Sequence, residues 1–144
     1  MPFPDLFAGA AISGTGMTAE RFRMEVIANN IANANSTRGP NGEPFRRQDV
    51  VFAEVLGGVR ADGTPELKGV TAVDLVDDPT EFEQVHMPGH PDADPETGMV
   101  KLPNVKLPVE MVNLLTATRA YEANLRAAQA FRTMNEQALV LLRG

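Results

Sequence analysis

Proline is distributed very unevenly along this chain of 144 residues. Nine of its 11 prolines lie between Pro40 and Pro108, and residues 5–39 and 109–144 contain none. Proline costs about 3 kcal/mol inside a helix, because it lacks the amide proton and its ring clashes with the preceding turn. Only the two proline-free ends can therefore form long helices. We expect a mainly α chain with a small β insert between its helical ends.

The C-terminal end predicts the longer helix, which starts after Pro108 and runs without glycine or proline to Arg143. At 1.5 Å per residue it would be about 50 Å long, a length typical of a coiled coil. Its apolar residues form two stripes at heptad spacing. One stripe holds Met111, Leu125 and Leu139, and the other holds Leu114, Tyr121, Ala128 and Leu142.

The N-terminal end predicts a second helix, from about Ile12 to Ala34. It also carries two apolar stripes. One is formed by Met17, Met24 and Ile31 with Ile27 beside them, and the other by Ile12, Ala19 and Val26. Two stripes on one helix imply more than one packing partner. The C-terminal helix can be one of them, and the chain offers no candidate for the other.

Four asparagines, Asn29, Asn30, Asn33 and Asn35, fall within seven residues at the end of this predicted helix. Asparagine is a mediocre helix former, so the cluster can mark a fraying helix end. Polar asparagines at packed positions can instead fix the register of neighbouring helices. Spacing alone leaves both interpretations open.

The middle of the chain is acidic and predicts short strands joined by turns. Residues 39–108 carry 13 acids and six bases, whereas the two ends together are nearly neutral. Alternation and β-branched residues predict strands at 49–52, 70–73 and 81–85. We therefore expect a discontinuous helical domain made of residues 1–38 and 107–144, and a β-rich acidic domain made of residues 39–106.

Composition excludes several classes of protein. The chain has no cysteine, so it forms no disulfide, no thiolate nucleophile and no cysteine-ligated metal site. Its net charge of −6 argues against nucleic acid as a partner. No apolar run approaches the roughly 20 residues that span a bilayer. The N-terminus lacks the basic and long apolar regions of a secretory signal, so we expect no cleaved signal peptide.

One segment resembles a metal site, because His86, His90, Asp92 and Asp94 lie within nine residues. A metal-dependent hydrolase centred on His86 and His90 is therefore the alternative from a different class. The Pro88–Gly89 turn excludes the helical spacing of a zinc protease motif. A surface turn in which the aspartates cap backbone amides explains the same residues. We expect no catalytic residue, no metal and no cofactor.

Several motifs follow one another in the order found in one protein family. They are the segments 28–37 (ANNIANANST), 45–52 (FRRQDVVF), 89–94 (GHPDAD), 103–105 (PNV), 110–115 (EMVNLL) and 119–124 (RAYEAN). Together they resemble the bacterial flagellar axial proteins, the rod and hook family. Segments 45–52 and 89–94 narrow the resemblance to a protein of the proximal rod. Another axial protein, either a neighbouring rod protein or a hook subunit, is the alternative within the family.

The resemblance implies a structural, non-enzymatic subunit that polymerises helically. Its end helices would pair as a coiled coil in the inner layer of a tube, with the β-rich domain outside. The tube would be the periplasmic drive shaft that carries torque from the motor to the hook and surrounds the export channel. Expected partners are the chain itself, other proximal and distal rod proteins, the adaptor to the membrane ring and the flagellar type III export apparatus. Segment 52–56 (FAEVL) matches a short element that helps export in this family.

Subunit packing would involve apolar and asparagine side chains of both helices. Our candidates are Met17, Met24, Ile27, Asn29, Asn30, Ile31, Asn33, Leu114, Tyr121, Asn124, Leu125 and Leu139. Among them, Asn29, Asn30, Asn33 and Asn124 are expected to form hydrogen bonds between helices that fix their register.

Overall fold

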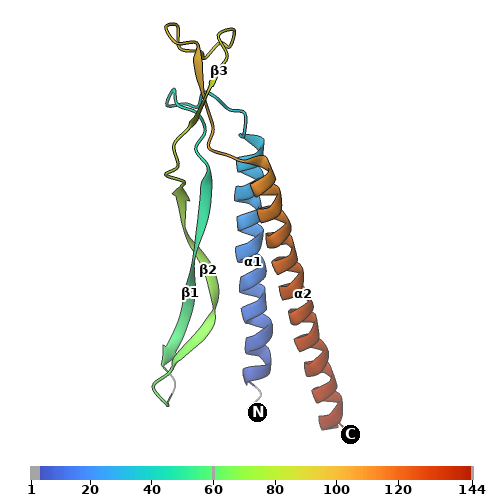
Figure 1. Ribbon diagram of the computed structural model, residues 1–144. Coiled ribbons are helices and arrows are strands. Elements are labelled where there is room, and N and C mark those ends of the chain that lie inside the picture. The colour runs from blue at the N-terminus through green and yellow to red at the C-terminus, as the bar shows by residue number, and fades with distance from the viewer. Residues whose placement is uncertain (1–3, 60, 144) are drawn as a thin grey trace. The chain divides into compact units, whose positions relative to one another are not determined.

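The structure is a computed structural model that describes residues 4–59 and 61–143. Along the chain, its elements are α1 (Pro4–Ala32), β1 (Gln48–Val59), β2 (Pro65–Asp77), β3 (Glu83–His86), β4 (Met99–Leu102) and α2 (Leu107–Arg143) (Figure 1). The prediction of a mainly α chain with a small β insert is confirmed.

Both helices begin at a proline-containing first turn. α1 starts at Pro4, well before the expected Ile12, because proline is tolerated where a helix has no partner for its amide anyway. α1 ends at Ala32, after which Asn33, Ala34 and Asn35 form a turn. α2 starts at Leu107, and Glu110 lies in its first turn. α2 ends at Arg143, the residue to which the sequence predicts it to run.

The strands are longer and more numerous than the sequence patterns predict. β1 and β2 have 12 and 13 residues and pair with each other in a two-stranded sheet. β3 and β4 form a second, antiparallel sheet, in which Glu83 faces Leu102 and His86 faces Met99. β4 was not predicted, since its four residues lie between a turn and a proline and are too few to show alternation.

The chain divides into two compact units, and the division crosses both helices and both long strands. The first unit contains α1 up to Met24, residues 51–74 of the β1–β2 hairpin, and α2 from Thr116 onward. The second contains residues 25–50 and 75–115. The expected division into residues 1–38 with 107–144 and residues 39–106 stays a prediction.

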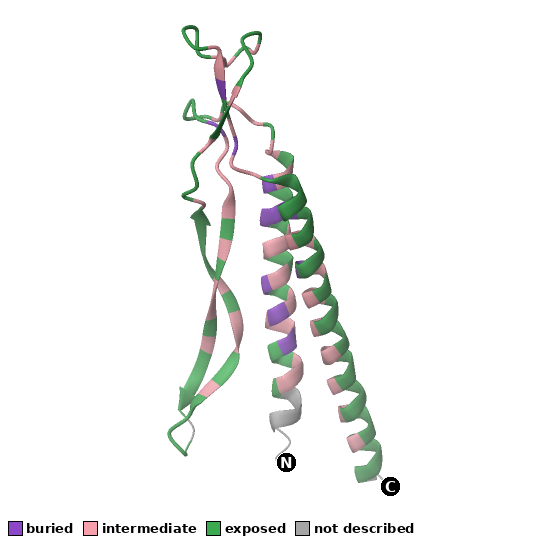
Figure 2. Ribbon diagram, viewed as in Figure 1, coloured by how far each residue is buried: buried purple, intermediate pink, exposed green. Residues whose placement is uncertain are grey.

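In the first unit, α1 lies between the hairpin and α2 (Figure 1). The buried residues of this unit are small: Ser13, Gly16 and Ala19 lie on α1, and Ala117 lies on α2. Much of α2 is exposed along its length (Figure 2), and large apolar residues such as Leu125, Leu139 and Val140 are among the exposed ones. The unit therefore leaves a large apolar surface uncovered.

In the second unit, the core combines apolar and polar side chains. Val26, Ile27 and Val100 are buried, and so are Asn30 and Glu110, both of which have no exposed surface. A membrane span is not found in the helices of the described residues, since none is both long and apolar enough to cross a bilayer.

Candidate functional site

In the first unit, α1 and α2 pack through glycines that accept side chains from the opposite helix. A methyl group placed on Gly9 would lie 2.6 Å from Cζ of Phe131, and one placed on Gly16 would lie 2.9 Å from the side-chain amide of Asn124. Since neither position has room for a side chain, the two helices approach closely at both points. The sequence predicts helix packing but does not identify these glycines as its contact points.

Seven of the ten described residues of α2 that are buried or half-buried in this unit recur at alternating steps of three and four, the other three being Thr118, Ala120 and Ala127. The seven are Ala117, Tyr121, Asn124, Ala128, Phe131, Asn135 and Ala138. This is heptad spacing, and the list includes Tyr121 and Ala128 of one predicted stripe, whose Leu142 is 65% exposed. The other predicted stripe stays at the surface, with Met111 62%, Leu125 38% and Leu139 51% exposed.

The hairpin touches α1 at a position that only glycine can occupy. Gly69 has a φ of +133°, and an added Cβ would collide with the side chain of Thr15. The amide of the next residue, Val70, donates a hydrogen bond to Oγ1 of Thr15 at 3.1 Å. The strand backbone itself therefore lies against the helix.

In the second unit, Asn30 and Glu110 form a buried polar cluster that joins α1, β1 and α2. The side-chain amide of Asn30 donates to Oε2 of Glu110 at 3.0 Å and to the carbonyl of Gln48 at 2.8 Å. Its oxygen accepts the amide of Gln48 at 3.0 Å. Nε of Arg47 donates to Oε1 of Glu110 at 2.8 Å. Every polar group of the two buried side chains thus has a partner, as buried charges require.

The cluster extends through Arg47 to the loops that precede β3 and α2. The Arg47 guanidinium also lies near the carboxylates of Asp49 and Asp78, at 3.2 and 3.5 Å. The backbone amide of Arg47 donates to the side chain of Asn104 at 2.7 Å. The side-chain amide of Asn104 donates in turn to the carbonyl of Asp78 at 3.1 Å. One arginine therefore ties together three segments that are distant in sequence.

These contacts shift the pKa values of two groups. Burial lowers the pKa of Arg47, but the hydrogen bond and charge of Glu110, helped by Asp49, outweigh it and raise the pKa above its usual value. Hydrogen bonds from the hydroxyl and amide of Thr80 hold the pKa of Asp78 below its usual value, and Arg47 adds to this effect. Both shifts favour the charged forms that the cluster needs.

Of the four asparagines expected to bond between helices, Asn30 does so in this chain. Asn33 donates to Asn29 one turn earlier in α1, and Asn124 donates to the carbonyl of Ala120 within α2. Within this chain Asn30 contacts α2, and Asn33 lies in the turn just past the end of α1. The role of the four asparagines in fixing register stays a prediction.

The remaining packing candidates divide by exposure. Ile27 is buried with Asn30, and half-buried positions are Met17, Met24, Ile31, Asn33, Leu114, Tyr121 and Asn124. Asn29, Leu125 and Leu139 are exposed. Their role in contacts between subunits stays a prediction.

The two histidines lie apart from any cluster of metal-ligating side chains in the part of the chain that the structure describes. Nδ1 of His90 accepts the backbone amide of Asp92 at 3.1 Å. Asp92 in turn accepts the hydroxyl of Thr37 and lies 3.5 Å from Arg38. His90 and Asp92 are therefore held by a hydrogen bond within the turn and by contacts with residues 37 and 38.

Sequence reasoning missed the pairing of Arg47 with Glu110. In the sequence, Glu110 and Arg47 stand only within separate family motifs, in segments 110–115 and 45–52. Nε of Arg47 and Glu110 lie in segments 63 positions apart, so no local pattern links them. The available signal was a carboxylate in an otherwise apolar first helical turn.

Comparison with known proteins identifies the family. Residues 11–40 match the family model described as "Flagella basal body rod protein", and residues 96–141 match "Flagellar basal body rod FlgEFG protein C-terminal". The chain is 37% identical to the flagellar basal-body rod protein FlgC of Borreliella burgdorferi, over 96% of this chain and 99% of that protein. It is 38% identical to FlgC of Yersinia enterocolitica, over 90% and 92% of the two chains. It is 36% identical to FlgC of Bacillus subtilis, over 92% and 95%. With both helical ends matched and full-length relatives above 30% identity, the chain belongs to the FlgC family of flagellar basal-body rod proteins.

Proposed function

We propose that this chain is a structural subunit of the proximal rod of the bacterial flagellar basal body. It polymerises helically with other rod proteins into the drive shaft that carries torque from the motor to the hook. It performs no catalysis, in keeping with a family of rod proteins.

The observation that carries this proposal is the second apolar face of α2. One face packs against α1, while Met111, Leu125 and Leu139 on another face stay exposed. Monomeric proteins rarely leave such apolar surface uncovered. Burying each of these side chains against a neighbouring subunit would contribute about 1.5–3 kcal/mol, which suits a stiff polymer.

In the rod, the end helices form the inner layer as a coiled coil, with the β-rich part of the chain outside. The alternating steps of three and four on α2 support this pairing. The glycine contacts at Gly9 and Gly16 support a close one. Surfaces that are not self-complementary join head to tail, and such contacts give open helical polymers rather than closed dimers. The lumen of the tube then serves as the export channel.

The chain reaches the periplasmic rod through the flagellar type III apparatus, without a cleaved signal peptide. Its lack of cysteine suits assembly in an oxidising compartment, because no disulfide has to form or can form wrongly. Segment 52–56 is a candidate export element, and Phe52 at its start is half-buried in the first unit. Its partners are other proximal and distal rod proteins, the adaptor to the membrane ring and the export apparatus.

Complementation tests the proposal. A strain that has lost its own copy of this gene should regain swimming and complete basal bodies when the chain is expressed. Gold-labelled antibody against the chain should then bind the proximal rod of isolated basal bodies. Label restricted to the hook would favour a hook subunit, and the absence of label from basal bodies would refute the proposal.

A further inference from the structure

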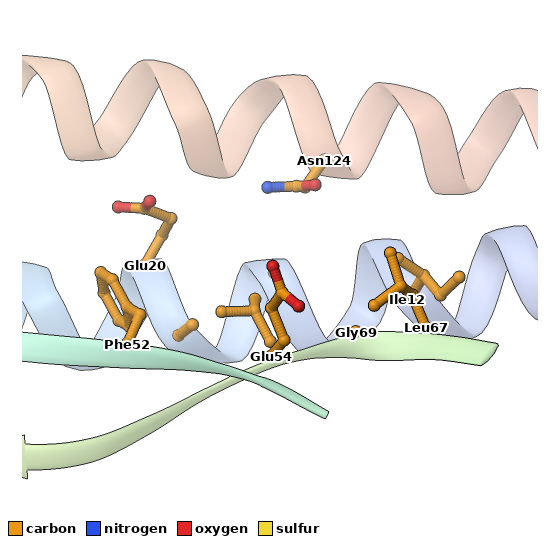
Figure 3. Close-up of a pocket in the computed structure, with 10 residues that line it drawn as sticks. Ile12, Glu20, Phe52, Glu54, Leu67, Gly69 and Asn124 are labelled. Carbon is orange, nitrogen blue, oxygen red and sulfur yellow. The ribbon is translucent and has the colours of Figure 1, made fainter. Parts of the chain in front are cut away.

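A groove of about 310 Å³ opens in the first unit, where the hairpin meets α1 and Asn124 of α2 forms part of the rim (Figure 3). Ile12 and Ala19 of α1 and Phe52 and Leu67 of the hairpin supply apolar walls. This volume lies at the low end for a small-molecule site. It suits one or two protein side chains better than a cofactor.

Two carboxylates give this apolar groove a negative charge. Glu20 lines it from α1, and Glu54 lines it from β1. Oε2 of Glu20 is buried and accepts no hydrogen bond within the described residues. Its nearest cationic atom is Nη1 of Arg23 at 3.8 Å, which is an ion pair without hydrogen-bond geometry. A buried acceptor without a donor is costly, and the charge of this carboxylate adds to that of Glu54 at the groove.

The exposed side of α2 carries side chains that match this chemistry. Leu115, Arg119 and Arg126 recur at steps of four and seven on one side of the helix. Leu115 is 52% exposed, and Arg119 and Arg126 are exposed as well. An arginine has an aliphatic stem that packs on apolar walls and a guanidinium that binds carboxylates. Arg126 already pairs with Glu122 at 3.2 Å, which leaves Arg119 as the better match.

We propose that the groove receives Arg119 and the adjoining apolar residues of α2 from a second copy of this chain. The inference rests on the proposed function, because it names one contact of the polymer. The groove and the exposed side of α2 are different surfaces of the same chain. The contact is therefore head to tail and can repeat from copy to copy.

Cross-linking in assembled basal bodies tests this contact. The chain has no cysteine, so a variant with Leu67→Cys at the groove and Leu115→Cys on α2 carries only the two introduced thiols. In a strain that depends on this variant, a short bismaleimide should give a ladder of dimers, trimers and longer products. Either single-cysteine variant should give no product beyond a dimer.

Charge reversal then tests the chemistry in the same double-cysteine background. Glu54→Lys and Arg119→Glu should each reduce the ladder at least fivefold, since attraction becomes repulsion. The combined swap should restore part of the ladder, because the reversed pair attracts again while Glu20 still lines the groove and repels the new carboxylate. Glu66→Lys, on the same hairpin but outside the groove, is the matched control and should leave the ladder unchanged.

Three results would overturn the inference: no ladder, a ladder insensitive to both reversals, or a swap that stays as weak as the single variants. Cross-linking of Leu67→Cys to a different protein would also overturn it, because the occupant would then not be a second copy. If the chain is present in basal bodies and gives none of the expected ladder, only this inference fails. If the chain is absent from basal bodies, the proposed function fails.

Discussion

Replacing Arg47 with methionine should destabilise the second unit far more than an ordinary surface substitution would. Glu110 has no exposed side-chain surface, and Arg47, with 16% of its side chain exposed, is its charged partner at 2.8 Å. Arg47→Met keeps the aliphatic stem but leaves a buried carboxylate without its cation. Breaking a buried ion pair in this way costs about 3–5 kcal/mol.

Removing both charges should cost much less. In the double variant Arg47→Met with Glu110→Leu, no carboxylate is left unpaired in the core. Asn30 keeps two hydrogen bonds, to the carbonyl and from the amide of Gln48. Replacing a whole buried pair by apolar residues is often neutral or stabilising. The double variant should therefore regain most of the stability that Arg47→Met loses.

Amide hydrogen exchange measures this difference locally. The amides of Gln48 and Asp78 are suitable probes, because they bond to Asn30 and to the carbonyl of Arg47 within the same unit. A loss of about 3–5 kcal/mol speeds exchange through unfolding by roughly two to three and a half orders of magnitude. Far-UV circular dichroism should first show that both variants keep their helices.

The reasoning fails if Arg47→Met speeds exchange by less than tenfold, or if the double variant exchanges as fast as the single one. The first result would mean that water or another cation replaces Arg47 without cost. The second would mean that the loss comes from the other ion pairs of Arg47, with Asp49 and Asp78, rather than from an unpaired Glu110.

Three further predictions concern the packing of α1 against α2, the loss of stability at low pH and the two histidines. Gly16→Leu should lower the stability of the chain by about 1–3 kcal/mol through overpacking against Asn124. Gly14→Ala meets nothing within 4 Å and should raise the stability by about 0.5–1 kcal/mol. Thermal unfolding followed at 222 nm compares the two variants, and equal effects would refute the close approach of the helices at Gly16. Because the pKa of Asp78 is lowered on folding, its contribution to stability is present above the unfolded pKa and is lost as the pH falls below about 4 through the folded value. Carbon-detected NMR should show this carboxyl titrating below its usual range, and Thr80→Val should raise its pKa; an unchanged pKa would show that Thr80 is not the cause. Metal analysis of the purified chain should find no stoichiometric metal, and bound zinc that disappears in His86→Ala and His90→Ala would restore the hydrolase as a candidate.

The helices could be predicted from sequence because proline and heptad spacing are local signals. Pro108 and the uninterrupted run after it indicated α2 to within two residues of its start at Leu107. The start of α1 was placed too late, because prediction relied on the stripe that begins at Ile12. The length of the hairpin was underestimated, because Gly57 and Gly58 interrupt the pattern of strand-forming residues in β1, which runs to Val59.

The candidate site was less accessible to prediction, because its contacts join segments that are distant in sequence. Asn30 carries a hydrogen bond between the two helices of this chain, yet its partner Glu110 lies 80 positions away. Similarly, nothing around Gly16 indicates that it accepts Asn124. Pairings of this kind depend on how two helices align, which spacing within either helix does not determine.

The antiparallel pairing of α1 with α2 has a consequence for the time at which the chain can fold. Met24 meets Thr118 across 94 positions, and Asn30 meets Glu110 across 80. Contacts at such separations form slowly, because a long loop must close before any of them is gained. Whichever end emerges first from a ribosome or an export pore has no partner until nearly the whole chain has followed. The pairing of α1 with α2 can therefore form only after nearly the whole chain has been released.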